Sequence, residues 1–466
     1  MGGPVAPRPF VLRATFQGTL VTPYDPSYEG ARVLFNNRIR TRPAVIAKCA
    51  DAGDVVAAVR FARDAGLPVA VRGGGHHASG FSLVEGGLVI DTGNLKDIAF
   101  DPGNATVVAG AGCGWRELDQ VTYVDHTTPD GHGLAGPGGE CPTVRNAGYS
   151  LGGGYGFLSR TYGLGCDHIL GAQLVTADGE VLNVTGDEHP DLLWALRGAG
   201  GAGFGVVTHL AYRLDPVPRT VLGGVMAWSL DDAEEALRAY RDLYVGRDED
   251  RLSIYLAIAT DPYPDGEPLL MAYGMYVGPV EDGEQELAPL RAVGTPVFDA
   301  FGPTSYTDLQ HALGAEIVYG LQLKWRGGYF RDGGFSDEAF AIIVDAARAP
   351  SGYSMLRFDL LGGGAIGAVA PDATAFVHRS RLFNISIIAQ WVRDDEAEAN
   401  LRWTDDLQDA LAPHLNGEVY QNYADADRAD WAQAYYGATY ARLQTIKQRY
   451  DPTDFFHHPQ SIRLPG

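Results

Sequence analysis

The sequence predicts an α+β protein with two lobes, and three observations support this. In residues 1–214, short apolar runs alternate with short helical ones, and glycine-rich turns follow them. From about Asp215 the pattern changes to long alternating segments with helical stretches between them. That change is typical of an antiparallel sheet covered by helices. Finally, 466 residues are more than one compact core usually holds.

The first lobe divides into elements that follow one another closely. Residues 54–65 repeat apolar side chains every three or four positions and end at Gly66, which predicts a helix. Helix, strand and glycine turn in this order indicate a nucleotide-binding lobe. Strands are predicted at 67–71, 88–91 and 106–109, and a hairpin joins 173–176 to 181–184.

The second lobe, residues 215–412, is predicted to be built on a sheet. In the segment 382–391, Asn384, Ser386 and Gln390 share a polar face, which is expected to line a pocket. Residues 413–466 form a third segment, with one helix over 430–449, that is expected to return to the first lobe. The other strands of the second lobe are expected at 252–259, 269–277 and 355–360, and its helices at 231–243 and 337–347.

Composition argues against several classes of function. Lys plus Arg is 36 and Asp plus Glu is 58, a net charge of −22 that repels nucleic acids and anionic membranes. Residues 1–17 lack the apolar run of a signal peptide, and no apolar segment of about 18 residues is present to span a bilayer. No C-x-x-C pair occurs, so neither a disulfide framework nor a metal site is expected. A cytoplasmic enzyme is expected.

Three glycine-rich turns suggest a ligand. Residues 72–76, Arg-Gly-Gly-Gly-His, follow a predicted strand, as phosphate-binding loops do, but they lack the Gly-Lys-Ser/Thr of a Walker A loop. Residues 198–203 match G-x-G-x-x-G as a string. They follow a helix and precede a strand, however, which is the reverse of a dinucleotide fingerprint, so an NAD site is rejected. Together with residues 151–156, Leu-Gly-Gly-Gly-Tyr-Gly, these turns indicate a long phosphate-bearing ligand.

In order and spacing, these motifs resemble those of the berberine-bridge-enzyme-like branch of the vanillyl-alcohol-oxidase/PCMH flavoprotein superfamily. The resemblance covers nearly the whole chain. It implies a PCMH-type FAD-binding domain and a substrate domain whose antiparallel sheet is backed by helices. The stretches that carry it are 71–76, 141–144 (Cys-Pro-Thr-Val), 198–208 and a C-terminal signature at 420–425, 440–443 and 451–462.

The resemblance implies an FAD that is attached twice, to His76 through the flavin 8α-methyl and to Cys141 through C6. His77 is a rival for the histidine link, and its spacing from the glycines favours His76. The further cofactor contacts that it implies are Arg72, Gly73, Gly74, Gly75, Val144, Gly148, Gly152, Gly153, Gly154, Gly156, Gly203, Gly205, Val207 and Asn422.

The same resemblance assigns the catalytic groups. Tyr423 is expected to take a proton from the substrate while hydride goes to flavin N5. Because a tyrosine has an ordinary pKa of about 10, a nearby cation or hydrogen-bond donor is expected to lower it. Asp359 is expected to accept the phenolic hydrogen bond. Substrate contacts are expected from the polar strand face of Asn384, Ser386 and Gln390, together with Lys324, Trp325, Arg326 and Tyr420.

The chain departs from the family pattern at a few positions. Arg145 and Ala147 stand where glycine is common, and Ala78 stands where many members carry tyrosine. Val144 occupies the position of the family's oxygen gatekeeper, and a small residue there implies an oxidase that releases hydrogen peroxide. The remaining cysteines are expected to be small buried hydrophobes: Cys49, Cys113 and Cys166.

Three functions remain open from the sequence. The first is an oxidase that acts with O₂ on a hydroxyl of a small molecule, namely a sugar, a glycoside or a glycosylated natural product. The second is an oxidative cyclase that forms a C–C or C–O bond with the same cofactor. The third is a flavin-free scaffold, against which the presence of both His76 and Cys141 argues. A monomer or a homodimer is expected.

Overall fold

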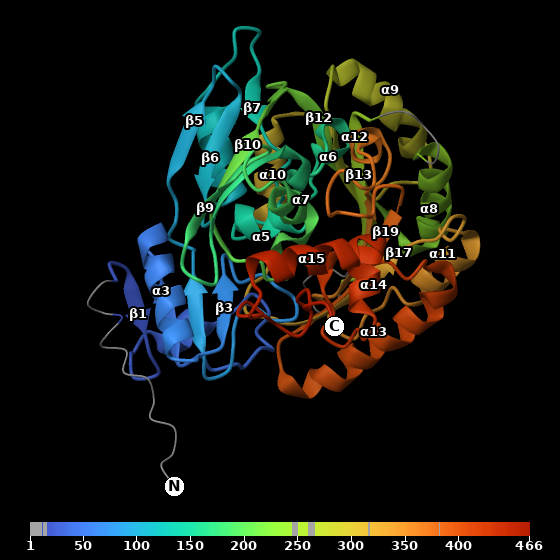
Figure 1. Cartoon of the computed structure of the whole chain (residues 1–466). Coiled ribbons are helices and arrows are strands. Elements are labelled where there is room, and N and C mark those ends of the chain that lie inside the picture. The colour runs from blue at the N-terminus through green and yellow to red at the C-terminus, as the bar shows by residue number, and fades with distance from the viewer. Residues whose placement is uncertain (1–11, 13–15, 245–249, 260–265, 316, 382) are drawn as a thin grey trace.

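The computed structural model describes residues 12, 16–244, 250–259, 266–315, 317–381 and 383–466. Most of residues 1–17 and Leu382, which carried sequence-based expectations, lie outside the described residues. The rest forms two lobes, with the C-terminal helices packed across the front of both in the view of Figure 1.

The first lobe contains two sheets. In the smaller one, strand order is β1-β2-β4-β3, and β2 and β3 both pair with β4 in parallel. The larger sheet is antiparallel, with the order β5-β6-β10-β8-β9. The strands are β1 (Thr19–Val21), β2 (Val45–Lys48), β3 (Val69–Arg72), β4 (Leu88–Asp91), β5 (Ile98–Asp101), β6 (Thr106–Gly110), β8 (Ile169–Val175), β9 (Val181–Val184) and β10 (Val206–Arg213).

Helix α3 (Ala52–Asp64) lies between these sheets and contacts β4, β8 and β10. Its N-cap is Asp51, whose carboxylate accepts a hydrogen bond from the Asp54 N–H at 2.9 Å. Gly66 adopts φ +63° after its end, a conformation that glycine takes at little cost. The predicted helix is therefore confirmed, as are the strands at 88–91 and 106–109 and the hairpin of β8 and β9.

Shorter elements complete the first lobe. A two-stranded ribbon pairs β7 (Gly133–Ala135) with β11 (Asp215–Val217), which lies just beyond the proposed boundary at residue 214. Cys49, Cys113 and Cys166 are fully buried, as expected. The helices are α2 (Tyr28–Arg32), α4 (Trp115–Asp119), α5 (Asn146–Leu151), α6 (Ser159–Tyr162) and α7 (Pro190–Ala199).

The second lobe is built on a large antiparallel sheet with the order β15-β12-β14-β13-β18-β19-β17, and β16 pairs with β12. The expected strands and helices are confirmed with small shifts at their ends. The strands are β12 (Val221–Ser229), β13 (Leu252–Ala259), β14 (Leu269–Tyr276), β15 (Phe298–Asp299), β16 (Gly302–Thr304), β17 (Gln322–Tyr329), β18 (Met355–Leu360) and β19 (Phe383–Trp391). The helices are α8 (Leu230–Tyr244), α9 (Val280–Arg291), α10 (Tyr306–Ala315), α11 (Asp337–Asp345), α12 (Gly364–Ala368) and α13 (Ala397–Leu411).

The two faces of this sheet have different partners. One face packs against helices, and Ile385 and Ile387 of β19 belong to the core formed there with α8, α9, α11 and α13. The other face turns to the first lobe, because Tyr255, Tyr273 and Tyr329 belong to that lobe's core. Asn384 and Ser386 lie on this second face. This second face of the sheet therefore forms the interface with the first lobe.

The tail packs on the core of the first lobe, but it does not form one helix. Residues 430–449 were expected to be continuous, whereas the structure has α14 (Trp431–Tyr436) and α15 (Tyr440–Tyr450). Gly437 interrupts them with φ +48° and ψ −128°, which lies outside the helical region. Ahead of them is the short 3₁₀ turn η6 (Gln421–Tyr423).

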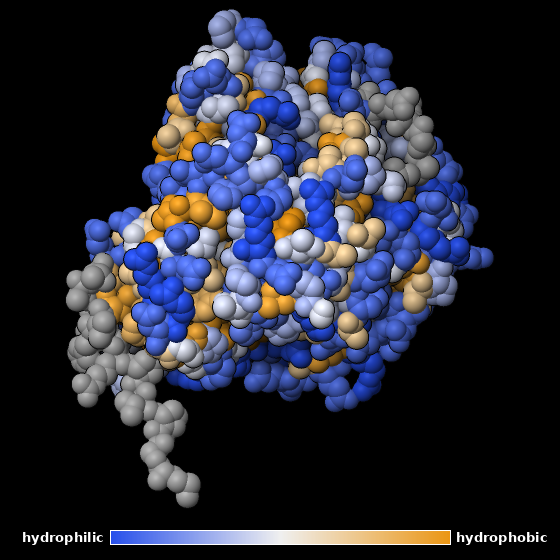
Figure 2. Space-filling model, viewed as in Figure 1, coloured by the Kyte–Doolittle hydropathy of each residue, from blue (hydrophilic) through white to orange (hydrophobic). Residues whose placement is uncertain are grey.

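The face of the molecule shown in Figure 2 is covered largely by hydrophilic residues, with hydrophobic ones in small groups. Among the described residues, no helix is both long enough and apolar enough to cross a membrane. Small exposed apolar groups of this kind are ordinary for a globular protein.

Candidate active site

Tyr423 lies where the two lobes meet. It ends the turn η6, and its ring stacks on Trp325 of β17 with centroids 4.2 Å apart and planes 25° apart. Its hydroxyl forms a short hydrogen bond with the hydroxyl of Tyr155, which belongs to the glycine-rich turn 151–156 of the first lobe. The tail, the sheet and the first lobe therefore all meet at this phenol.

Tyr155 connects Tyr423 to Asp359. Its hydroxyl donates to Asp359 Oδ2 at 2.5 Å, and the Asp359 side chain is fully buried. Since Tyr155 has only one hydroxyl proton and gives it to Asp359, Tyr423 must be the donor in the bond between the two phenols. The direct bond from Tyr423 to Asp359 that the sequence predicted is replaced by this relay.

The sequence reasoning missed Tyr155. The glycines of the turn 151–156 predict close approach of the backbone and assign no role to the tyrosine among them. The available signal was an aromatic residue held within a run of glycines, which place backbone close to other groups and so fix the direction of a neighbouring side chain.

Arg357 supports the far end of the relay. Residues 357 and 359 are two apart on β18, so their side chains lie on the same face. Arg357 Nε donates to Asp359 Oδ1 at 2.7 Å, and its two terminal nitrogens face the Glu140 carboxylate at 3.2 and 3.4 Å. The guanidinium also lies over the rings of Tyr255 and Tyr273, at 5.1 and 5.6 Å from their centroids.

Both phenols of the relay are held in the protonated form. Burial, followed by the nearby Asp359 carboxylate, raises the pKa of Tyr423 well above its usual value, and Arg357 and the hydrogen bond to Tyr155 oppose this in part. Burial and Asp359 likewise raise the pKa of Tyr155. The expected cation is therefore present as Arg357, but its effect is outweighed. Tyr423 consequently needs an acceptor for its own proton before it can take another.

His76 and Cys141 lie together about Thr143. His76 Nε2 is 2.6 Å from Thr143 Oγ1, and Cys141 Sγ is 3.6 Å from the same oxygen. Tyr319 completes the group, with its hydroxyl 3.0 Å from Thr143 Oγ1. Burial and then Arg145 lower the pKa of His76 to about 4, so its imidazole is neutral at pH 7. The structure thus brings the two predicted attachment residues to one place.

His77 has different surroundings. Its ring packs against Phe81 and His458, with centroids 4.8 and 6.3 Å away. Burial lowers its pKa to about 3. Among the described contacts, only His76 of the pair reaches the Thr143 hydroxyl.

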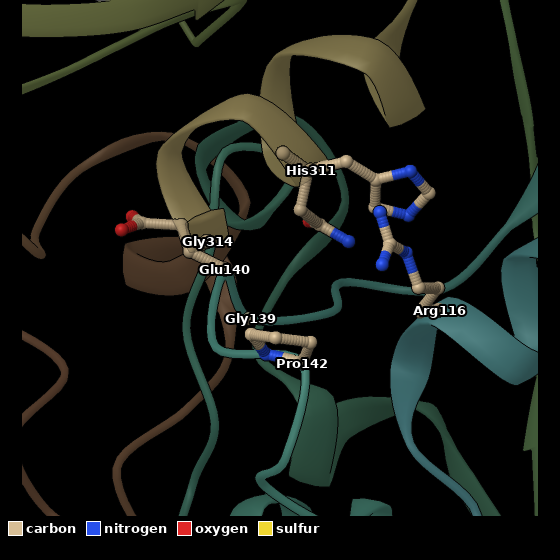
Figure 3. Close-up of a pocket in the computed structure, with 7 residues that line it drawn as sticks. Arg116, Gly139, Glu140, Pro142, His311 and Gly314 are labelled. Carbon is tan, nitrogen blue, oxygen red and sulfur yellow. The ribbon is translucent and has the colours of Figure 1, made fainter. Parts of the chain in front are cut away.

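A small cavity lies behind the segment that carries Cys141. It has a volume of about 70 Å³ and is lined by Arg116, Gly139, Glu140, Pro142, Gln310, His311 and Gly314. In Figure 3 the Arg116 and His311 side chains lie near each other, and the Glu140 side chain points away from them. The segment 139–142 is partly buried and lines this cavity together with Arg116 of α4 and three residues of α10.

Comparison with known proteins decides the family. Residues 43–185 match the family described as FAD binding domain, and residues 419–463 match the one described as berberine and berberine like. The uncharacterized FAD-linked oxidoreductase YgaK of Bacillus subtilis is 31% identical over 96% of each chain. This chain is a berberine-bridge-enzyme-like FAD-linked oxidoreductase.

Other members support the same assignment. (R)-6-hydroxynicotine oxidase of Paenarthrobacter nicotinovorans is 29% identical over 97% of this chain and 98% of its own. Glucooligosaccharide oxidase of Sarocladium strictum is 29% identical over 92% of this chain and 89% of its own. The solved structure of Physcomitrella patens BBE-like 1 superposes with a TM-score of 0.89 at 26% identity, covering 98% and 99% of the two chains. The α+β, PCMH-type fold of this oxidoreductase is thus established.

The residues of the oxidoreductase fit its FAD. An imidazole and a partly exposed thiol meet at one hydroxyl, and both are nucleophiles that can attach a flavin. No described residue comes within 4 Å of the position that a side chain on Gly148 would take, so this backbone has an open side. Arg145 Nε is buried without a hydrogen-bond partner in the described structure. Among the described residues, no cluster of metal ligands is present.

Most of the predicted glycines are required by contacts within the oxidoreductase itself. A Cβ on Gly74 would lie 2.5 Å from Thr143 O, and one on Gly156 would lie 1.9 Å from Gly138 O. These approaches of backbone to backbone explain the glycines without a phosphate group. A Cβ would also lie too close to neighbouring side chains at Gly152, Gly153 and Gly154. At Gly203 it would meet Phe456 O, and at Gly205 it would meet Leu174 and Val175 O.

Three further predicted cofactor residues also have protein partners. Arg72 is buried and bonded to Asp91 at 2.5 Å. Val207 is buried in β10. Asn422 donates to the Tyr420 hydroxyl at 2.8 Å and to Tyr149 O at 3.0 Å. The remaining predicted contacts lie in the two loops that carry the attachment residues: Gly73 and Gly75 are in the loop of His76, and Val144 is in that of Cys141.

The predicted substrate residues do not all come together. Asn384 is buried opposite Asp359 in the sheet, whereas Gln390 lies six residues along β19, about 20 Å away at the rise of a strand. Lys324 forms ion pairs with Asp425 and Asp427, both at 2.6 Å. The Tyr420 hydroxyl accepts a hydrogen bond from the Gly154 N–H at 2.8 Å. Two members of this set therefore lie beside the relay. Asn384 pairs with Asp359 across the strands, and the Tyr420 ring lies 5.4 Å from that of Tyr155 and 4.9 Å from that of Tyr423.

Proposed function

We propose that this enzyme is an oxidase that removes hydrogen from an alcohol carbon of a sugar, a glycoside or a glycosylated natural product. One observation carries the proposal, namely the buried chain of hydrogen bonds from Tyr423 through Tyr155 to Asp359. A hydroxyl group has to lose a proton as its carbon loses hydride, and this chain can accept that proton.

The relay works in one direction. The substrate hydroxyl gives its proton to Tyr423 Oη as Tyr423 passes its own proton to Tyr155, and Tyr155 passes its proton to Asp359. No phenolate has to persist, which matters because both phenols have raised pKa values. General base catalysis of this kind contributes roughly 10²–10⁴-fold to a rate. When bound, FAD accepts the hydride at N5 and passes the electrons to O₂, which is released as hydrogen peroxide.

We propose that the FAD is linked to both His76 and Cys141. The neutral imidazole keeps a lone pair for bond formation, and the thiol lies on the same side of Thr143. Val144 follows directly in the same segment, and its small side chain supports the proposed reaction with O₂. The relative named glucooligosaccharide oxidase supports a carbohydrate alcohol as substrate.

A second candidate function is oxidative ring closure in a secondary metabolite. Beside Tyr423, the ring of Trp325 adjoins an apolar group formed with Phe35, Met355 and Ile388. Such a surface suits a polycyclic aromatic substrate better than a free sugar. The two candidates share Tyr423 as the base and differ in the product.

The test is a peroxide-coupled screen of oligosaccharides, aryl glycosides and benzylisoquinoline-type alkaloids. We expect one of the first two groups to give a carbonyl product and one equivalent of peroxide. A cyclised product would favour the second candidate. The Tyr423→Phe variant should reduce its flavin roughly 10²–10⁴-fold more slowly, and an undiminished rate would refute the proposed base.

Attachment is tested separately by mass spectrometry of acid-precipitated protein. The wild-type chain should carry one FAD. The His76→Ala and Cys141→Ala variants should each keep it through the remaining bond, and the double variant should lose it on precipitation. Covalent flavin that survives in the double variant would show that other residues hold it.

A further inference from the structure

We propose that Glu140 is a positioning residue for the relay: it holds Arg357 against Asp359 and so sets the charge that acts on Tyr423. The proposal rests on the proposed function, in which Tyr423 is the base. It gives a role to the residue directly before Cys141, which the family motif does not include.

The geometry of the guanidinium carries the inference. Arg357 Nε donates a hydrogen bond to Asp359 at 2.7 Å. Its two terminal nitrogens donate to the two Glu140 oxygens at 3.2 and 3.4 Å. A planar guanidinium held on two edges has little freedom to rotate. Without Glu140, the terminal nitrogens would lose their partner, and the orientation that aims Nε at Asp359 would depend on the Tyr255 and Tyr273 rings alone.

Glu140 is itself firmly held. A Cβ on Gly314 of α10 would lie only 2.4 Å from Glu140 O, so helix and segment pack backbone against backbone. Figure 3 shows the Glu140 side chain directed away from Arg116 and His311, the cationic or titratable side chains of that cavity. Its carboxylate has 14% of its side-chain surface exposed and is committed to Arg357.

The arrangement has a consequence for charge. Two carboxylates share one guanidinium, so Glu140 neutralises part of the positive charge that would otherwise favour the Tyr423 phenolate. Removing the Glu140 charge leaves Arg357 acting more strongly on Tyr423. For charges on the order of 10 Å apart and an effective dielectric constant of about 20, the change is about one pH unit.

The other groups around Tyr423 keep their charges when Glu140 is replaced. Tyr420 is its neighbour in the tail, Tyr155 is its hydrogen-bond partner and Trp325 is a neutral ring. On the side of the tail, a cavity of about 70 Å³ also touches Tyr423 and is lined by Arg326, Gly327, Gln408, Val419, Asp425, Asp427 and Arg428.

The charges at that cavity are matched by opposite charges. Asp427 pairs with Lys324 at 2.6 Å, and Arg428 with Asp430 at 2.9 Å. Arg326 pairs with Asp405 at 2.8 Å. Among the described residues, none of these side chains forms a hydrogen bond or ion pair with Glu140, so they keep their partners in a Glu140 variant.

The experiment follows the ionisation of Tyr423 directly, without a substrate. The holoenzyme is labelled with 3-fluorotyrosine, and the ¹⁹F signal of Tyr423 is assigned by its loss in Tyr423→Phe. Glu140→Gln keeps one side-chain oxygen that accepts from Arg357 and removes the carboxylate charge, so we expect it to move the ionisation midpoint down by about one pH unit. Glu140→Asp should restore the midpoint in large part. Glu29→Gln is the matched control, because Glu29 pairs with Arg32 and Arg42 on the surface of the first lobe.

A midpoint that is unchanged or raised in Glu140→Gln would overturn the proposal. If ionisation of the wild-type signal is only beginning at the highest pH that the fold tolerates, the ratio of ionised to protonated Tyr423 at that pH should be about tenfold larger in Glu140→Gln, and equal ratios would also overturn the proposal. Because the measurement needs no turnover, its outcome is independent of the screen. A failed screen would refute the proposed substrate class and leave the Glu140 result standing.

Discussion

The replacement of Tyr155 by phenylalanine tests the relay most directly. The ring keeps its packing against Tyr420 and Tyr255, whose centroids are 5.4 and 6.0 Å away, and only the hydroxyl is lost. Asp359 then loses a donor at 2.5 Å in a fully buried site, and Tyr423 loses its acceptor. A hydrogen bond to a charged group contributes about 1.5–3 kcal/mol and a neutral one about 1 kcal/mol. We therefore expect a loss of about 2–4 kcal/mol in stability.

The effect on chemistry should be larger than the effect on folding. Without Tyr155, the proton of Tyr423 has no path to Asp359, so flavin reduction by the alcohol identified in the screen should slow by roughly 10²–10⁴-fold. Stopped-flow absorbance measures this rate, and thermal unfolding of the holoenzyme measures stability. Tyr240→Phe is the control, because it removes a buried phenolic bond to Ile254 O at 2.7 Å in the second lobe. Reduction by Tyr155→Phe at the wild-type rate would show that the relay is not used.

The remaining predictions concern stability. Burial raises the pKa of Asp119 to about 8, so the folded state favours its protonated form, and stability falls as pH rises from about 4 to 8. Between pH 5 and 7, Asp119 should lower the free energy of unfolding of the wild-type protein by about 3 kcal/mol, and Asp119→Asn should abolish this decrease. Urea midpoints measure it, and an equal dependence on pH in the two proteins would contradict it. Gly156→Ala should lower the melting temperature by several degrees, because its Cβ meets Gly138 O at 1.9 Å, whereas Gly30→Ala, with open space, should not. Lys447→Met should cost about 3–5 kcal/mol by leaving Asp451 buried and unpaired, and a loss below 1 kcal/mol would refute this.

Local patterns in the sequence were sufficient to predict many of the elements. The helix α3 has a clear apolar repeat and a capping aspartate, and β13 and β18 have the predicted bounds. The helix over 430–449 was wrong because apolar periodicity continues across Gly437, although the backbone there leaves the helical region. Periodicity detects which face is buried and does not detect a break that preserves that face.

The candidate site was predictable in part. The motifs indicated His76, Cys141, Asp359 and Tyr423, but Tyr155 and the pairing of Arg357 with Glu140 required the structure. Those contacts join residues more than 200 positions apart in the chain, and no local pattern reports such a distance. The glycines were correctly seen as points of close approach, yet for Gly74 and Gly156 the approaching group is the chain's own backbone.

The position of Tyr423 in the tail has a consequence for how the enzyme is made. Residue 423 of 466 leaves the ribosome long after the segments that carry His76 and Cys141, and its neighbours in the tail pack on the first lobe. A growing chain therefore carries most of the first lobe, Tyr155 included, before it carries Tyr423, the proposed base. The proposed oxidation therefore requires the tail to be synthesised and packed on the first lobe before the proposed base is in place.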